Sequence, residues 1–148
     1  MVNTEKISEA RLIIKQWRNK DLSVGFVPTM GYLHEGHKSL IERARAENDR
    51  VAVSIFVNPI QFGPNEDFEK YPRDLKHDLD MCRAAGADMI FSPSADEMYP
   101  LKSLAYVDVN ELGENLCGKS RTNHFRGVCT VVAKLFNIIT PDKAYFGQ

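Results

Sequence analysis

The sequence predicts an α/β fold in which a parallel β-sheet is flanked by helices. Short apolar runs alternate along the chain with segments whose apolar residues recur at helical spacing. Residues 51–57 form a near-continuous β-branched run, which is typical of a strand buried on both faces of a parallel sheet. Because helical segments separate the strands, we expect one Rossmann-like domain over residues 1–148.

The N-terminal third is predicted to contain a helix, a strand and a second helix. Residues 4–19 place their apolar side chains on one helical face, and Asn3 or Thr4 can cap this helix. A turn then leads into a buried strand at residues 24–27. Residues 38–48 again show helical spacing, so the stretch before them is predicted to be a strand-to-helix turn.

The middle of the chain continues the alternation. The strand at residues 51–57 is followed by a polar loop at residues 58–64, and a helix is expected over residues 73–85 with Gly86 as its C-cap. Its inward-facing residues are expected to be Leu75, Leu79 and Cys82. The first two buried strands therefore deliver polar loops to one edge, where open parallel sheets bind their ligands.

The last third contains the clearest helical pattern, at residues 128–139, which Pro141 ends. Residues 88–91 and 143–146 are predicted to be strands of the sheet, and residues 92–102 a loop. Residues 106–109 alternate, which predicts either an edge strand or a strand outside the main sheet. Residues 112–127 show little periodicity.

Composition narrows the class of protein. The chain has 148 residues, 43% hydrophobic and 26% charged, as in ordinary globular domains. A formal net charge of −1 gives no reason to expect nucleic acid or an acidic membrane as a partner. Three cysteines without repeated spacing argue against a disulfide framework and fit a reducing, cytoplasmic location. No apolar run approaches the ~18 residues of a membrane span.

The strand-to-helix turn carries the residues with the clearest chemical meaning. It reads Pro28-Thr29-Met30-Gly31-Tyr32-Leu33-His34-Glu35-Gly36-His37. The first N–H groups of a helix lack partners within it and carry the positive end of its dipole, so this turn can hold phosphate. Gly31 and Gly36 leave room for a ligand to approach the backbone, and His34 and His37 add donors.

Two other roles for the histidine pair have to be weighed. His34 and His37 could simply cap the helix, or they could bind zinc, which needs three or four protein ligands. The other possible zinc ligands form no paired spacing: His77, Cys82, Cys117, His124 and Cys129. Nucleotide binding is therefore the favoured interpretation.

The H-x-G-H element resembles the signature of the nucleotidyltransferase and class I synthetase superfamily. The longer string P-T-M-G-Y-L-H-x-G-H resembles the pantothenate synthetase family, as do residues 54–62, residues 124–136 and residues 145–148. These stretches occur in the order expected for that family. One departure is Thr122, which follows Arg121 where the family commonly has proline.

The resemblance extends over the N-terminal domain of the family. Members continue with F-G-x-K-D and then a smaller C-terminal domain, whose K-M-S-x-R-like loop closes on ATP phosphates; neither is present in this sequence. The chain ends directly after an expected strand. We therefore expect an N-terminal ATP- and pantoate-binding domain without the C-terminal lid, derived from a longer protein.

The family reaction joins pantoate and β-alanine into pantothenate, at the expense of ATP, through a pantoyl adenylate. The resemblance implies His34 and His37 as catalytic residues, which donate hydrogen bonds to phosphate oxygens or, in the case of His37, act as an acid. The residues it implies for ATP are Met30, Gly31, Tyr32, Leu33, His34, Glu35, Gly36, His37, Gly147 and Gln148. Those it implies for pantoate or β-alanine are Pro28, Met30, Asn58 and Gln61.

Several roles remain open at the level of sequence. Asn58 either supports the pantoate pocket or caps its loop, and residues 66–78 either assist a magnesium ion or form a solvated acidic loop. Magnesium is expected mainly on the ATP phosphates. Arg121 and His124 either line a substrate channel or, for His124, pack the loop at Phe125. The resemblance also implies a homodimer.

Two alternative functions differ in class from this one. The first is another H-x-G-H nucleotidyltransferase that transfers AMP to a phosphorylated acceptor, although residues 58–62 offer neutral amides instead of basic side chains. The second is a non-catalytic binding or assembly domain. We expect this chain to bind its ligands without turning them over.

Overall fold

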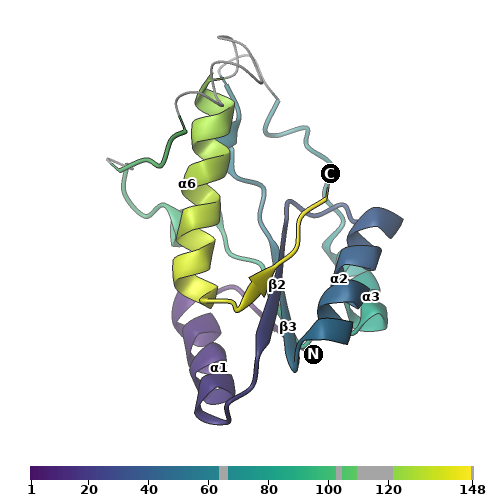
Figure 1. Cartoon of the computed structure of the whole chain (residues 1–148). Helices are drawn as coiled ribbons and strands as arrows, with labels where there is room; N and C mark the ends of the chain where they lie inside the picture. The colour runs from purple at the N-terminus through teal and green to yellow at the C-terminus, as the bar shows by residue number, and fades with distance from the viewer. Residues whose placement is uncertain (64–66, 103–104, 110–121, 148) are drawn as a thin grey trace.

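A single parallel sheet organises the protein. The computed structural model describes residues 1–63, 67–102, 105–109 and 122–147. Five strands lie in the order β1-β4-β3-β2-β5 and every neighbouring pair is parallel (Figure 1). The strands are β1 (Val2–Thr4), β2 (Val24–Thr29), β3 (Arg50–Ile55), β4 (Met89–Phe91) and β5 (Lys143–Ala144). The predicted α/β fold with a parallel sheet is confirmed.

Helices cover both faces of the sheet. Helices α1 (Ile7–Asn19) and α6 (Thr122–Ile139) lie on one face, and α2 (Glu35–Glu47) and α3 (Leu75–Ala85) lie on the other (Figure 1). Each face has its own apolar cluster, because side chains of a strand alternate between the two sides. The first cluster contains Ala10, Ile14, Phe26, Phe91, Leu135 and Ile139. The second contains Val27, Ile41, Ala44, Val53, Cys82 and Ile90.

The first residues of the chain differ from the prediction. Asn3 and Thr4 were expected to begin or cap a helix, but with Val2 they form β1, which pairs with Met89–Phe91. Helix α1 begins at Ile7, after Lys6, and the hydroxyl oxygen of Thr4 accepts a hydrogen bond from the Lys6 backbone N–H. An edge strand of three residues carries no periodic signal of its own, so its pairing with a distant strand decided the outcome.

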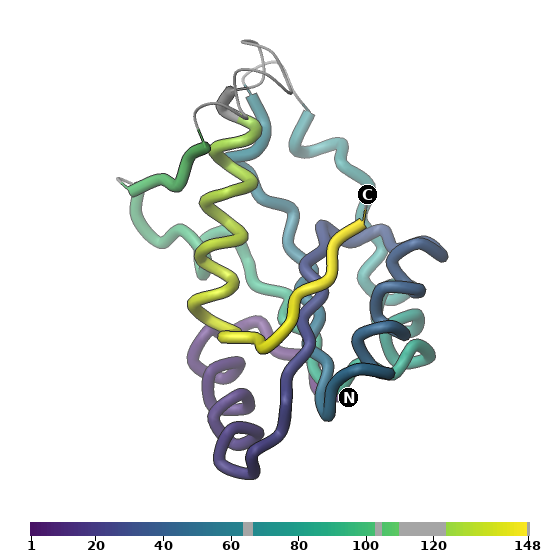
Figure 2. The backbone as a smooth tube through the Cα atoms, viewed as in Figure 1, coloured from purple at the N-terminus to yellow at the C-terminus, as the bar shows by residue number. Residues whose placement is uncertain are grey.

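Strand β2 runs further than the predicted 24–27 and includes Pro28 and Thr29. On one side it pairs with β3 along its whole length, whereas β5 pairs only with Gly25 and Phe26. Proline cannot donate to a ladder, and it is tolerated here because β5 does not extend to this position. Figure 2 shows the C-terminal segment running alongside β2 in the same direction.

The predicted helix at 73–85 is α3, and Gly86 ends it in the left-handed conformation, with φ of 100°. Cys82 is buried and Leu79 packs against the second apolar cluster, as predicted, but Leu75 is 42% exposed and Asp78 is buried. A short helix, α4 (Ala95–Met98), lies within the expected loop at 92–102, and the Ser94 side chain caps it. An acidic residue on an inward helical face needs a polar partner, and the site described below provides it.

The last helix is longer than predicted. Helix α6 begins at Thr122, so residues 124–127 are helical, although they lack an apolar period. They face the 3₁₀ turn η1 (Pro59–Gln61), which explains the lack of a simple stripe. Residues 106–109 form no strand and instead lie against α6, where the Thr130 hydroxyl accepts from the Val107 N–H. In the described part of the chain, no helix could cross a membrane.

Candidate functional site

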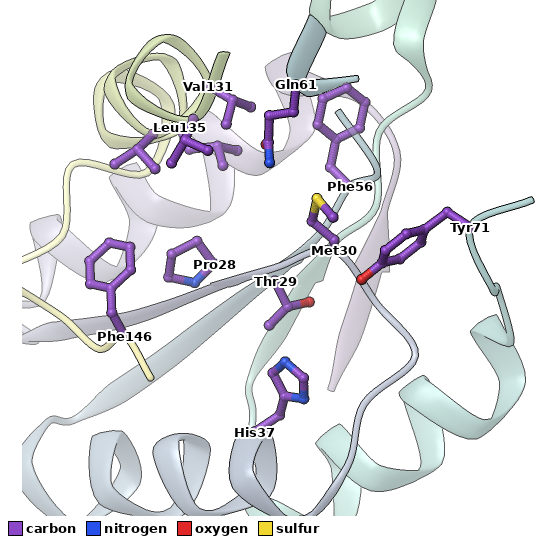
Figure 3. Close-up of a pocket in the computed structure, with 12 residues that line it drawn as sticks. Pro28, Thr29, Met30, His37, Phe56, Gln61, Tyr71, Val131, Leu135 and Phe146 are labelled. Carbon is purple, nitrogen blue, oxygen red and sulfur yellow. The ribbon is translucent and has the colours of Figure 1, made fainter. Parts of the chain in front are cut away.

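A pocket opens at the carboxyl edge of the sheet, where β2 and β3 end and face α6. Its volume is about 280 Å³. Figure 3 shows His37 and Thr29 on one side of it, Gln61 on another, and Phe146 at its margin. The described residues that line it are Pro28, Thr29, Met30, His37, Phe56, Gln61, Tyr71, Val128, Val131, Val132, Leu135 and Phe146. The predicted turn and the predicted polar loop therefore meet at one pocket.

Asp78 fixes the backbone of the turn. Gly31 and Tyr32 have positive φ values of 82° and 52°, so the chain reverses sharply between β2 and α2. The buried Asp78 carboxylate accepts hydrogen bonds from Tyr32 N–H at 2.9 Å and Leu33 N–H at 2.8 Å. Hydrogen bonds to a charged acceptor are stronger than those between neutral groups. Through Asp78, helix α3 therefore determines the path of the turn.

The two histidines cap helix α2 reciprocally. His34 is the N-cap, and its Nδ1 accepts from Gly36 N–H at 3.0 Å. His37 Nδ1 accepts from His34 N–H at 3.2 Å, and the two ring centroids are 4.1 Å apart. Since each Nδ1 accepts a hydrogen bond, each neutral ring carries its proton on Nε2. Both imidazoles can therefore donate to an anion, and the capping role that was weighed as an alternative is also fulfilled.

Partial burial favours the neutral form of His37. The pKa of His37 lies below its ordinary value, first because the ring is partly desolvated and second because His34 stands beside it; the Asp78 carboxylate acts in the opposite direction. Protonation would also have to occur at Nδ1 and would break the capping bond to the His34 N–H. The geometry thus favours neutral hydrogen-bond donation by His37 over acid catalysis.

The residues implied for ATP occupy different positions in the turn. Met30 and His37 line the pocket, and the side chains of Tyr32, His34 and Glu35 are exposed at the start of α2. Leu33 is buried in the core beneath α2, so it can offer a ligand only its backbone. Gly147 is exposed, with open space around it, and Gln148 lies outside the described residues.

Asn58 lies beneath the pocket wall. Its side chain is fully buried, and its Nδ2 donates to Gln61 Oε1 and to the Gly127 carbonyl oxygen, both at 3.1 Å. Its Oδ1 accepts from the Tyr99 hydroxyl at 2.9 Å. Gln61 itself lines the pocket, with its amide nitrogen pointing inward (Figure 3). Of the two roles weighed for Asn58, its side chain makes no capping hydrogen bond to η1 and instead holds the Gln61 side chain that lines the pocket.

Helix α6 closes this side of the pocket. A Cβ atom on Gly127 would lie 2.7 Å from the Ile60 carbonyl oxygen and 2.8 Å from Gln61 Cα, so glycine permits the close approach of α6 to η1. His124 Nδ1 lies 3.1 Å from the Gln61 carbonyl oxygen, which requires a proton on that nitrogen. His124 therefore packs the loop, and Arg121 lies outside the described residues.

Several residues in or behind the pocket could not be identified from local sequence. Tyr71, Phe56 and the α6 residues reach the pocket only through the fold, and Tyr99 contacts Asn58 across 41 residues. Asp78 did leave a signal, since it is one turn from the buried Cys82 on the same face of a helix. A carboxylate on a buried helical face needs a hydrogen-bond donor there, and the backbone N–H groups of the turn are those donors.

No group of three or more histidine, cysteine or acidic side chains within the described ranges is arranged to hold a metal ion. Asp78, the buried acidic residue that contacts the turn, uses both carboxylate oxygens for backbone N–H groups. The described residues therefore do not fit a protein-held magnesium or zinc site, and no chemical step is assigned to a metal.

Comparison with known sequences identifies the family. The model of the Pantoate-beta-alanine ligase family matches residues 3–148. The pantothenate synthetase of Clostridium botulinum (strain Kyoto / Type A2) is 60% identical over all 148 residues of this chain and 52% of its own length. The pantothenate synthetase of Desulfitobacterium hafniense (strain Y51) is 58% identical with the same coverage. The chain thus spans about half the length of the curated relatives it matches.

Solved structures agree with this result. A crystal structure of pantothenate synthetase from Thermus thermophilus superposes with a TM-score of 0.92 and 47% identity, over 99% of this chain and 52% of that one. Pantoate-beta-alanine ligase from Francisella tularensis, complexed with beta-gamma ATP and beta-alanine, gives 0.87 and 43%, over 97% and 55%. The Rossmann-like fold, the H-x-G-H turn and the match over residues 3–148 place this chain in the pantoate–beta-alanine ligase family.

Proposed function

We propose that this chain is the N-terminal, ATP- and pantoate-binding domain of a ligase that makes pantothenate from pantoate and β-alanine. The observation that carries the proposal is a pocket lined both by the H-x-G-H turn and by mainly apolar side chains, into which the Gln61 amide points. The Francisella structure, a family member with ATP and beta-alanine bound, supports these ligand classes.

The nucleotide would lie at the start of α2. Its phosphates would face the positive end of the helix and receive hydrogen bonds from Nε2–H of His34 and His37. Residues 30–37 and Gly147 with Gln148 are the proposed ATP contacts. Magnesium would arrive on the phosphate oxygens, where it neutralises charge.

Pantoate would occupy the apolar half of the pocket. Pro28, Met30 and the α6 side chains Val131 and Leu135 offer surface for its hydrocarbon part, and Gln61 offers a hydrogen bond for an oxygen. None of the described lining residues is lysine or arginine. This lining suits a small acid better than the phosphorylated acceptor of the alternative nucleotidyltransferase.

The chemistry then depends mainly on positioning. A pantoate carboxylate oxygen would attack the α-phosphorus, forming a P–O bond while the bond to the bridging oxygen breaks and pyrophosphate leaves. The β-alanine amine would next attack the acyl carbon, forming the C–N bond, releasing AMP and losing a proton. The fixed donors at the start of α2 would stabilise charge on the phosphates in the first step.

The chain by itself is proposed to bind ligands without forming pantothenate. Its relatives are about twice as long, and the resemblance assigns the loop that closes on the phosphates to their C-terminal half. We also propose that the whole protein is a cytoplasmic homodimer; light scattering on the purified whole protein would show a mass of two chains.

The decisive experiment is pantoate-dependent exchange of pyrophosphate into ATP, measured with the whole protein. We expect exchange in the wild type, and Gln61→Ala should reduce it strongly while calorimetry shows unchanged ATP affinity. Absence of pantoate-dependent exchange in the wild type would refute the proposed reaction. Exchange without pantoate, or with a phosphorylated acceptor in its place, would favour the alternative nucleotidyltransferase.

A further inference from the structure

We propose that Tyr99 is a positioning residue that acts through Asn58 to hold the Gln61 amide with its nitrogen toward the pocket. This inference rests on the proposed function, since it concerns how the acceptor substrate is held. It has a chemical consequence: the ligand atom that meets Gln61 must accept a hydrogen bond, as a carboxylate or hydroxyl oxygen does. The argument starts from a backbone carbonyl on α6.

The Gly127 carbonyl oxygen fixes the orientation of Asn58. A carbonyl oxygen can only accept, so the Asn58 atom 3.1 Å from it must be the amide nitrogen. Gly127 comes this close because it lacks a side chain that would strike η1. The opposite atom of the Asn58 amide is therefore Oδ1, and it faces Tyr99.

Asn58 in turn fixes the orientation of Gln61. The second N–H of Asn58 Nδ2 donates to Gln61 at 3.1 Å, so the Gln61 atom that receives it must be Oε1. Gln61 Nε2 is then left on the other side of the amide, and it points into the pocket (Figure 3). A free glutamine could donate or accept, whereas Gln61 in this arrangement presents a donor.

The Tyr99 hydroxyl completes the chain of bonds. It donates to Asn58 Oδ1 at 2.9 Å, which leaves neither end of this fully buried amide without a partner. Burial raises the pKa of Tyr99 to about 12, so the hydroxyl keeps its proton. The Tyr99 ring is held between Phe56, with centroids 6.2 Å apart, and the Lys134 ammonium, 4.4 Å from the ring centroid.

This arrangement explains why an asparagine that does not reach the pocket lies directly beneath it. Without the Tyr99 donor, Asn58 Oδ1 would be buried and unsatisfied, and the Gly127 carbonyl oxygen alone would oppose rotation of the amide. A rotated amide would present its oxygen to Gln61 in place of the present donor. Gln61 could then turn its own oxygen to the pocket, which would repel a carboxylate. The Tyr99 hydroxyl and the Gly127 carbonyl oxygen therefore hold the two ends of the Asn58 amide together, and through it they fix which end of Gln61 faces the pocket.

The test compares Tyr99→Phe with a matched control. Tyr99→Phe removes the hydroxyl and keeps the ring between Phe56 and Lys134. Tyr145→Phe also deletes a tyrosine hydroxyl that is hydrogen-bonded to an asparagine, Asn48, at the far end of α2. Calorimetry on this chain would measure pantoate and ATP affinity in both variants and the wild type.

We expect Tyr99→Phe to weaken pantoate binding by about tenfold, the order expected for one lost hydrogen bond, with ATP affinity unchanged. NMR should show that the Asn58 side-chain amide protons exchange with solvent at least about tenfold faster in Tyr99→Phe. Tyr145→Phe should leave both pantoate affinity and Asn58 exchange at wild-type values.

The outcomes separate this inference from the proposed function. If the wild type fails to bind pantoate, the proposed function is wrong, and the Asn58 exchange data still decide whether Tyr99 holds the amide. If the wild type binds pantoate and Tyr99→Phe binds it equally well, the inference is overturned. Unchanged Asn58 exchange in Tyr99→Phe would overturn it as well.

Discussion

Asp78 should be the side chain on which the H-x-G-H turn depends most. Its carboxylate is 1% exposed and accepts one hydrogen bond on each oxygen, from Tyr32 N–H and Leu33 N–H. In Asp78→Asn, one oxygen is replaced by an NH₂ group of nearly the same size. One backbone N–H then loses its acceptor and faces another donor.

The expected magnitude follows from this count. Loss of one hydrogen bond to a charged acceptor costs roughly 1.5–3 kcal/mol, and the buried N–H left unpaired makes the upper half of that range more relevant. With a urea slope of about 2 kcal/mol/M, a loss of ~2 kcal/mol lowers the unfolding midpoint by about 1 M. The turn should also loosen, so ATP should bind more weakly.

The assay is urea unfolding of this chain followed by circular dichroism, with Asp74→Asn as the matched control. Asp74 caps α3 by accepting from His77 N–H, a position where asparagine and aspartate are nearly equivalent. The control should stay within about 0.5 kcal/mol of the wild type. An Asp78→Asn midpoint within about 0.2 M of the wild-type value would refute the reasoning, since the turn would not need the carboxylate.

Three further predictions concern pH, packing and thiol chemistry. Because the pKa of His37 is lowered in the folded chain, the unfolded chain binds a proton there more readily, so the free energy of unfolding falls as the pH drops from 7 through the ordinary histidine pKa of about 6.5. Urea titrations should show that His37→Gln loses less stability over this pH range than the wild type, and an equal loss in both would contradict the prediction. Gly127→Ala should cost on the order of 1–3 kcal/mol, because its Cβ would meet backbone atoms; Gly147→Ala, in open space, is the neutral control, and equal midpoints would show that α6 can shift freely. Burial raises the pKa of Cys82 to about 12, so iodoacetamide at pH 8 should label it only as fast as the chain unfolds, and rapid labelling of the native chain, located by mass spectrometry, would disagree.

The pattern of the sequence was sufficient for elements whose signal is local. The run at residues 51–57 predicted β3 because a strand buried on both faces must be apolar on both. The cap at Gly86 was predictable because its left-handed conformation suits glycine. The turn at residues 28–37 was recognisable because its strand, glycines, histidines and helix follow one another directly in the sequence.

Errors occurred where distant segments decide the conformation. Residues 2–4 joined the sheet through β4, almost ninety positions away, and the start of α6 was set by its contact with η1. The histidines were open between donor and acid roles because only the folded turn shows which ring nitrogen accepts. Asn58 was ambiguous because its three partners come from η1, α6 and the residue after α4.

The sequence by itself determined the fold class, the position of the H-x-G-H turn and, through its motifs, the family. Each of these depends on residues that are neighbours along the chain, and local periodicity and spacing record them directly. Only the tertiary structure decided that Asp78 holds the turn, and that Tyr99 and Gly127 orient the Asn58 amide, which in turn contacts Gln61. Hydrogen-bond direction is a property of atoms brought together by folding, and the order of residues does not record it.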